Sequence, residues 1–171
     1  MAGVFPMKSQ KFVFSFIFLL FTLTLTLGTG SPGSERTPVK PGPRDKCPVC
    51  GMFVAKYPDW GAEILFKDGT HAFFDGAKDM FKYYFNLKNY HPSKTTGDID
   101  SIYVTDYYDL TWTDGNKAFY VIGSDVYGPM GRELIPFKEE AGAKDFLKDH
   151  KGKSILKFKE VTPEVVKKLD H

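Results

Sequence analysis

A repeat within the chain constrains its fold more than any other feature. The run Gly76–Phe81, which reads Gly-Ala-Lys-Asp-Met-Phe, recurs in the second half as Gly142–Leu147, which reads Gly-Ala-Lys-Asp-Phe-Leu. Each copy sets apolar residues at positions i, i+3 and i+4, which is the spacing of one face of an α-helix. Two helices with the same pattern predict two similar units joined in tandem.

The sequence around each run predicts three short strands, two before the helix and one after it. The first set is Ala62–Phe66, Thr70–Phe74 and Ile99–Thr105, and the second set is Ala118–Ile122, Glu133–Phe137 and Ser154–Phe158. Asp68-Gly69, between the first two strands, is a strong hairpin signal. The predicted fold is therefore α+β, with two tandem small ββαβ repeats. We expect them to pack together, because a unit of about 60 residues buries little surface alone.

Several carboxylates and one hydroxyl are interpreted as turn and cap residues. We predict that Asp75 caps the first repeat helix by accepting from the free N–H groups of its first turn. A closing helix is predicted to begin at Thr162 and Pro163, a cap followed by proline at the first helical position. Asp106 and Asp109 are interpreted as turn residues, since no pair of these carboxylates has a spacing that specifies acid–base chemistry.

The first thirty residues read as an export signal. Lys8 and Lys11 precede the uncharged, mostly apolar run Phe12–Leu27, and small residues follow it. Such a run is short for a full membrane span, so we favour a cleaved signal over an uncleaved anchor. We predict a signal peptide or N-terminal anchor at 1–30, a flexible linker at 31–46, a first ββαβ subdomain at 47–115 and a second at 116–171.

Charge and motif content argue against two function classes. The net charge is +2, and the excess comes from Lys8 and Lys11 in the predicted signal. The remaining chain has no basic stripe that could neutralise phosphates, so we expect no nucleic-acid partner. The sequence also lacks a phosphate-binding glycine loop, a nucleophile elbow and a zinc-protease helix. We therefore expect that the protein is not an enzyme.

The motif that can carry chemistry is Cys47-Pro-Val-Cys50-Gly-Met52, at the junction of the linker and the first subdomain. Thiolate and thioether sulfurs are soft ligands, which select copper(I) over hard cations. Cys50 and Met52 would share a face of an extended segment, and Gly51 lets the backbone bend so that the two sulfurs converge. In an exported chain the default for the two cysteines is a disulfide, so a metal site requires that they stay reduced.

A third metal ligand is expected from elsewhere in the chain. Met130 lies between Pro129 and Gly131 in the loop of the second repeat, where a tight turn would hold it at the surface, although methionine usually prefers the core. The alternative is that Met130 folds back to fill a gap in the core. His71, at the start of a strand, could supply a nitrogen ligand, but a histidine there is more often a surface or hydrogen-bonded residue.

Several motifs between Cys47 and about Val161 occur together in one order: Cys47–Val54, Ile102–Tyr107 with Trp112, Ala118–Val121, Gly128–Gly131 and Glu133–Phe137. In these motifs and their order the chain resembles the nitrous oxide reductase accessory proteins, the NosL family.

This resemblance implies a periplasmic copper(I)-binding chaperone of two ββαβ halves. Such a protein delivers copper for maturation of nitrous oxide reductase, an enzyme of denitrification, or of a related copper enzyme, assisted by a membrane transporter complex. The family's Cys-x-Met falls on Cys50 and Met52 and its Pro-Met-Gly on Met130, whereas Cys47 stays open as a ligand or a redox partner. Many relatives are lipoproteins with a cysteine directly after the signal. Since no cysteine precedes Cys47, we expect no lipid anchor.

Other interpretations of the two cysteines stay open. One is a periplasmic thiol-disulfide oxidoreductase that uses Cys47 and Cys50, although a catalytic CxxC normally opens a helix and Gly51–Val54 looks extended. Another is a structural zinc site completed by His71 and His91, whose spacing matches no common zinc knuckle. In a third, formation of a disulfide would remove the thiolate and eject copper.

Overall fold

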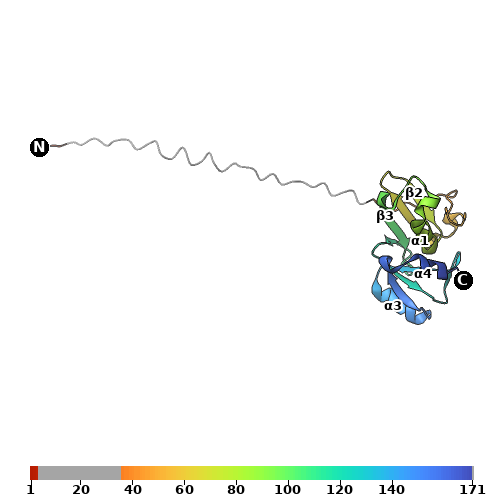
Figure 1. Ribbon diagram of the computed structural model, residues 1–171. Helices are drawn as coiled ribbons and strands as arrows, with labels where there is room; N and C mark the ends of the chain where they lie inside the picture. Colours follow the sequence, from red (N-terminus) through yellow and green to blue (C-terminus); the bar gives the residue numbers. More distant parts are fainter. Residues whose placement is uncertain (4–35, 171) are drawn as a thin grey trace. The chain divides into compact units, whose positions relative to one another are not determined.

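Two antiparallel sheets of similar topology make up the folded part of the chain (Figure 1). The computed structural model describes residues 1–3 and 36–170. The signal peptide or anchor that we predict at 1–30 therefore lies, apart from its first three residues, outside the described residues. Within the described part of the chain, no helix has the length and apolar character needed to cross a membrane.

The first sheet contains β1 (Ala62–Phe66), β2 (His71–Phe74), β3 (Ile99–Thr105) and β4 (Trp112–Asp114), in the order β2-β1-β3-β4. Helices α1 (Ala77–Phe85) and α2 (Leu87–Tyr90) connect β2 to β3. All five residues of β1 are buried, because this strand is central in the sheet and α1 packs against it. The chain thus leaves the sheet at the end of β2 and enters α1 directly.

The second sheet repeats this arrangement with β5 (Phe119–Ile122), β8 (Ile135–Phe137) and β9 (Ser154–Lys157), in the order β8-β5-β9. Helix α3 (Glu140–Asp149) connects β8 to β9, as α1 connects β2 to β3. In both sheets the first strand is central and pairs with the strands before and after the helix. The predicted α+β fold is confirmed, and the order of its elements is consistent with two tandem ββαβ repeats.

Two additions distinguish the second unit. A small hairpin of β6 (Tyr127–Gly128) and β7 (Gly131–Arg132) is inserted between β5 and β8. Helix α4 (Pro163–Lys168) follows β9 and packs on α1 of the first unit. The remaining elements are single 3₁₀ turns, at Val54–Lys56, Pro58–Trp60, Thr96–Asp98 and Phe158–Glu160.

One hydrophobic core joins the two units. Phe81 of α1 packs against Tyr120 of β5 and against Phe158, with ring centroids 5.2 Å and 4.9 Å apart. Phe81 and Tyr120 are fully buried, so each unit covers apolar surface that the other would expose to water. A second, smaller cluster lies between α3 and the other face of the second sheet, and consists of Val121, Ile135, Phe137, Ala143 and Phe146. The expectation that the halves pack together is confirmed.

Most predicted strands are present within one residue of their predicted bounds, and the larger differences lie at Glu133, at β4 and at the β6–β7 hairpin. Ala62–Phe66 and Ile99–Thr105 are strands with the predicted bounds. The strand predicted at Glu133–Phe137 begins only at Ile135, because Glu133 directs its carboxylate to the backbone of α1. Strand β4 was not predicted, since its three residues show no alternation of apolar and polar positions. The closing helix does begin at Pro163, and the Thr162 hydroxyl accepts from the N–H of Val165 at 3.4 Å.

The segment that precedes the first unit makes defined contacts from Arg36 onward. The Arg36 guanidinium donates to the carbonyl oxygens of Phe66 and Lys67 at 3.3 Å and 3.2 Å. The N–H of Val39 donates to the buried Glu63 carboxylate at 2.9 Å. The predicted linker at 31–46 therefore includes a part, 36–46, that hydrogen-bonds to the first sheet. Its proline and glycine content favoured a tether, but the buried carboxylate needs this donor. The predicted boundaries at 47–115 and 116–171 stay predictions.

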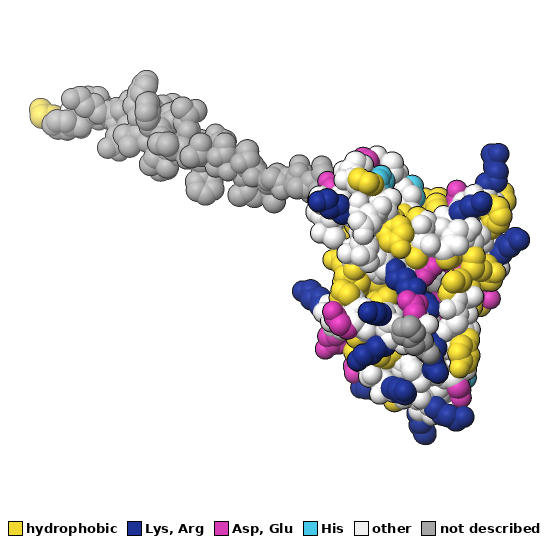
Figure 2. Space-filling model, turned by 45° about the vertical axis from the view of Figure 1, so that its right-hand side comes forward, with side chains coloured by type: hydrophobic (Ala, Val, Ile, Leu, Met, Phe, Trp, Pro, Cys, Tyr) yellow, Lys and Arg dark blue, Asp and Glu magenta, His cyan; other side chains and the backbone are white. Residues whose placement is uncertain are grey.

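The surface carries both signs of charge. Figure 2 shows Lys and Arg side chains spread over one face of the folded unit, with acidic and apolar side chains between them.

Candidate metal centre

The Cys47–Met52 segment forms a closed turn, whereas we predicted that Cys50 and Met52 lie in an extended segment. The N–H of Cys47 donates to the carbonyl of Met52, and the N–H of Gly51 donates to the carbonyl of Cys47, both at 2.9 Å. Gly51 has φ +78°, a left-handed conformation that glycine adopts without steric cost. The predicted bend at Gly51 is thus present, and it places the two thiols on the same side of the turn.

Both cysteines are free thiols. Cys47 is buried and Cys50 is partly buried. Burial raises the pKa of the Cys47 thiol well above its ordinary range and that of Cys50 to about 12, although backbone N–H groups directed at both sulfurs oppose this shift. At neutral pH the free protein therefore holds both groups as thiols, and a cation that binds them must displace their protons.

This environment does not fit the thiol-disulfide oxidoreductase that we considered. A catalytic CxxC lowers the pKa of its attacking thiol, commonly at a helix N-terminus. Here the motif lies in a turn that is followed by single-turn 3₁₀ segments, and burial moves both pKa values upward.

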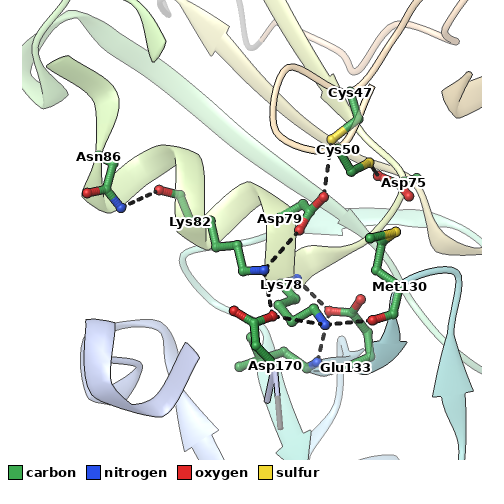
Figure 3. Close-up of polar contacts among 11 residues, drawn as sticks. Cys47, Cys50, Asp75, Lys78, Asp79, Lys82, Asn86, Met130, Glu133 and Asp170 are labelled. Carbon is green, nitrogen blue, oxygen red and sulfur yellow. Dashed lines mark hydrogen bonds and ion pairs between the residues drawn. The ribbon is translucent and has the colours of Figure 1, made fainter. Parts of the chain in front are cut away.

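Two buried carboxylates of the first unit face the thiols (Figure 3). Cys50 Sγ donates to Asp75 Oδ1 at 3.1 Å, and Cys47 Sγ donates to Asp79 Oδ2 at 3.4 Å. One ligand atom from each of these four residues lies within 4.8 Å of all the others. Asp75 follows the last residue of β2 and Asp79 lies in the first turn of α1, so the strand-to-helix junction places both carboxylates under the cysteine turn.

The interpretation of Asp75 as a helix cap was wrong. The N-cap residue of α1 is Gly76, and it makes no side-chain cap hydrogen bond. The carboxylate of Glu133, from the second unit, accepts the N–H of Lys78 at 2.5 Å instead. Negative charge near a helix N-terminus is favourable because of the helix dipole. Burial raises the pKa of Glu133 to about 8, against the effect of the N–H donors of Leu134 and Lys78.

Lys78 holds the inserted hairpin against α1. Its backbone N–H donates to Glu133, and its side-chain Nζ donates to the carbonyl oxygen of Met130 at 2.7 Å. These two hydrogen bonds fix Met130 and Glu133 to the first turn of α1, the helix that also carries Asp79. Figure 3 shows the Met130 side chain extending from this anchor toward Cys50 and Asp75. Met130 is 42% exposed, so it does not fill a gap in the core.

Positive charge surrounds the carboxylate side of the site. Lys82 Nζ lies 3.7 Å from Asp79 Oδ1 and 2.6 Å from Asp170 Oδ1. Asp170 also lies 3.5 Å from Lys78 Nζ. Asp170 follows α4, so the C-terminal helix is tied to the same face of α1 that supports the cysteine turn.

Of the predicted ligands, the structure brings Cys47 and Cys50 together and directs Met130 toward them. Met52 is partly buried and closes the cysteine turn through its backbone. His71 is held elsewhere: its Nδ1 pairs with the buried Glu63 carboxylate, and its ring stacks on Phe73. The four-residue group of thiols and carboxylates does not include His71.

Sequence reasoning missed Asp79 and misread Asp75. A signal was present, because both carboxylates lie close in sequence to the predicted start of the helix, Asp75 just before it and Asp79 in its first turn. Their burial could not be read from that spacing. It depends on the cysteine turn and on the hairpin of the second unit, which cover them in three dimensions.

Comparison with known proteins identifies the family of the chain. The family model for NosL matches residues 38–166. The copper-binding lipoprotein NosL of Stutzerimonas stutzeri is 29% identical over 126 residues, which cover 68% of this chain and 62% of the relative. The match thus spans less than two thirds of that relative. Because the relative is named a lipoprotein, it gives no support to our prediction that this chain lacks a lipid anchor.

The chain shares its fold with a solved crystal structure. The crystal structure of the copper chaperone NosL from Shewanella denitrificans has a TM-score of 0.64 and 21% sequence identity, and the match covers 75% of this chain and 97% of that one. The solution structure of apo-NosL from Achromobacter cycloclastes is 28% identical, with a TM-score of 0.44 over 61% of this chain and 87% of that one. Since the family model matches most of its length, this chain belongs to the NosL family.

Proposed function

We propose that this chain binds copper(I) and passes it to a client copper enzyme, without catalysing a reaction itself. Cys50 supplies the thiolate, and Met52 and Met130 supply thioethers. The observation that carries the proposal is the attachment of the Met130 hairpin to α1 through Lys78 and Glu133, since it holds a distant methionine beside the cysteine turn. Relatives named as copper-binding and as a copper chaperone support the choice of metal.

The chemistry of the donors favours the monovalent ion. Sulfur ligands are soft and match copper(I), which is stable with few ligands. Met130 is 42% exposed and Cys50 only partly buried, so sulfurs from a partner protein can reach an ion held between them. Copper(I) can then move by stepwise exchange of ligands. Cys47, which is 1% exposed, supports the site from the interior.

The setting of this activity rests on the family resemblance. The client is nitrous oxide reductase or a related copper enzyme, and a membrane transporter complex assists its maturation. The chain acts in the periplasm after export through its N-terminal signal. Loss of client activity in a strain without this chain, restored by the wild-type chain but not by a Cys50→Ser variant, tests this part of the proposal.

Copper(I) titration of the reduced full-length chain, in competition with a coloured copper(I) chelator, tests the binding. We expect stoichiometric binding that is lost in Cys50→Ser. Met52→Leu and Met130→Leu are each expected to weaken binding by about 10–100-fold, since each removes one soft donor while keeping the volume of the side chain.

His71→Ala is the matched control, because His71 pairs with Glu63 outside the group of thiols. Its copper(I) affinity should equal that of the wild type. Undiminished binding by Cys50→Ser, or equal losses in His71→Ala and Met130→Leu, would contradict the proposed ligand set. A Cys47→Ser variant measured alongside assigns Cys47 as a direct ligand or as a supporting thiol.

A further inference from the structure

The turn between β3 and β4 presents large apolar side chains to water. Tyr108 is 49% exposed and Leu110 is 55% exposed, and both lie outside the candidate metal centre. The half-buried rings of Trp60 and Tyr107 continue this surface. Trp60 contacts Tyr107 with ring centroids 6.1 Å apart, and Tyr107 contacts Tyr108 at 5.5 Å. Adjoining exposed apolar side chains, unlike scattered single ones, mark interaction sites.

The buried carboxylate of Asp106 fixes the conformation of this turn. Its Oδ1 accepts the N–H groups of Tyr108 and Asp109, both at 2.8 Å, and its Oδ2 accepts the N–H of Lys138 at 2.7 Å. The Leu110 N–H donates to the Asp106 carbonyl oxygen at 3.0 Å. These bonds hold the turn against the second unit before any partner arrives, so docking there loses little conformational entropy.

Leu110 carries a conformational cost that the fold does not require. Its φ is +53°, in the left-handed region that glycine and asparagine adopt readily and in which a leucine is strained. An exposed leucine also gains little free energy from burial. A leucine that is both strained and exposed stabilises the protein less than asparagine would at the same position. This combination indicates a role in binding.

Carboxylates flank the exposed Tyr108 ring. Burial raises the pKa of the Tyr108 hydroxyl, and the Asp149 and Asp145 carboxylates raise it further, so both lie near the ring. The two are four residues apart and therefore share one face of α3, while Asp109 lies in the turn itself. No side chain within residues 36–170 forms an ion pair with these three carboxylates, whereas Glu140 pairs with a lysine of its own helix.

We propose that the β3–β4 turn and the adjoining face of α3 form a docking surface for a partner protein. The docking surface consists of Tyr108 and Leu110 together with the carboxylates of Asp109, Asp145 and Asp149. Its occupant is a segment that carries apolar side chains for the first two residues and lysine or arginine side chains for the carboxylates. This inference goes beyond the proposed copper(I) function, because none of these residues belongs to the candidate metal centre.

The charge of the docking surface distinguishes among candidate occupants. Its three carboxylates repel anionic lipid headgroups, which disfavours a membrane surface, and they attract a cationic segment. Figure 1 shows α3 at the opposite end of the folded part from β2, which leads into the candidate metal centre. A partner docked at α3 therefore leaves the side of Cys50 and Met130 open.

Two synthetic peptides test the chemistry of the occupant, one of alternating leucine and lysine residues and one with glutamate in place of each lysine. Each peptide is titrated into the isotope-labelled full-length chain, and the backbone amide signals are followed by NMR. We expect the lysine peptide to shift the signals of the β3–β4 turn and of α3. It should also bind at least about tenfold more tightly than the glutamate peptide. High salt should weaken this binding, because it screens exposed charges.

Leu110→Asn separates a docking role from a structural one. Asparagine tolerates the left-handed conformation, so this variant should unfold at a temperature about 2–4 °C higher than the wild type. It should bind the lysine peptide at least about fivefold more weakly, since the apolar contact is lost. Lys151→Asn is the matched control, because Lys151 is the other non-glycine residue with a positive φ, +55°, in the described part of the chain. It should bind the peptide at least as tightly as the wild type.

The carboxylates are tested one at a time. Asp145→Asn and Asp149→Asn should each weaken binding of the lysine peptide by about 2–5-fold, as expected for exposed ion pairs. Glu140→Gln is the matched control, because it removes one negative charge from another side of the same helix. Its affinity for the lysine peptide should equal that of the wild type.

Three results would overturn the docking surface. They are equal binding of the two peptides, signal shifts that lie outside the β3–β4 turn and α3, and undiminished peptide binding by folded Leu110→Asn. Self-association of the chain, or binding to vesicles of anionic phospholipid, that Leu110→Asn abolishes would overturn the proposed occupant. Copper(I) affinity of Leu110→Asn should equal that of the wild type, so this surface and the proposed function can fail independently.

Discussion

The two copies of the Gly-Ala-Lys-Asp run form equivalent helices but have different surroundings. In α1, Lys78 and Asp79 are both 2% exposed, and each contacts a group from outside its helix. In α3, the Lys144 side chain is 63% exposed and pairs with Glu140 of its own helix, and Asp145 is exposed. The same local sequence thus specifies the same helix, whereas the neighbours of that helix decide which of its polar residues are buried.

Those neighbours come from two segments outside the repeated run. The cysteine turn precedes the first unit, and the β6–β7 hairpin is inserted into the second unit yet lies on the first helix. The candidate metal centre therefore arises where an insertion from one repeat covers the helix of the other. Paired substitutions at equivalent positions in α1 and α3 test this difference directly.

The largest difference is expected between Phe81→Ala in α1 and Leu147→Ala at the equivalent position in α3. Phe81 is fully buried in the core that joins the units, so its truncation should cost about 3–5 kcal/mol of the free energy of unfolding. Leu147 is only partly buried, so its truncation should lower the free energy of unfolding by less. Urea unfolding of both variants measures the two losses, and equal values would contradict a shared core centred on Phe81.

An intermediate difference is expected between Lys78→Ala and Lys144→Ala. Lys78→Ala removes the charged hydrogen bond to the Met130 carbonyl and should cost about 1.5–3 kcal/mol of unfolding free energy. It should also weaken copper(I) binding, since the hairpin that carries Met130 loses an anchor. Lys144→Ala breaks an exposed ion pair and should change stability by less than about 0.5 kcal/mol, with unchanged copper(I) affinity.

Both the free energy of unfolding and the copper(I) affinity must be measured, because removal of any buried lysine could lower stability alone. Normal copper(I) affinity in a folded Lys78→Ala variant would remove the main support for Met130 as a ligand.

At the glycines, the two equivalent substitutions should change stability with opposite signs. A Cβ at Gly76 would lie 2.4 Å from the Glu133 carboxylate, so Gly76→Ala should destabilise the protein by about 1–3 kcal/mol. A Cβ at Gly142 meets only ordinary contacts, the nearest at 3.5 Å, within a helix that alanine favours. Gly142→Ala should therefore stabilise by about 0.4–1 kcal/mol. Thermal unfolding compares them, and a stabilising Gly76→Ala would refute the close approach of Glu133.

Much of the fold could be predicted because its signals are local. Strand β1 and strand β3 have the predicted bounds, and Thr162 caps the last helix as expected. Apolar periodicity and turn residues fix such elements wherever they occur in a chain. The same information predicted that the units pack together, since neither could bury enough surface alone.

The polar groups of the site were harder to predict, because their partners are distant in the sequence. Nothing in Lys78-Asp79 distinguishes it from Lys144-Asp145, so burial of the first pair cannot be read from either copy. Glu133 was assigned to a strand, although its carboxylate binds the first turn of α1. The cysteines and Met130 could be identified as candidate ligands, because their residue types alone indicate soft sulfur donors. The ligand set itself stays a prediction.

Because Glu133 of the second unit caps α1 of the first, the first unit is completed only after the second has been partly synthesised. Chains leave the ribosome N-terminus first, so both cysteines and the whole first sheet exist before Glu133 and Met130 are made. During that interval the first helix lacks its cap, and the thiols lack the hairpin that lies beside them. The environment of the two thiols is therefore complete only after the hairpin of the second unit has been made.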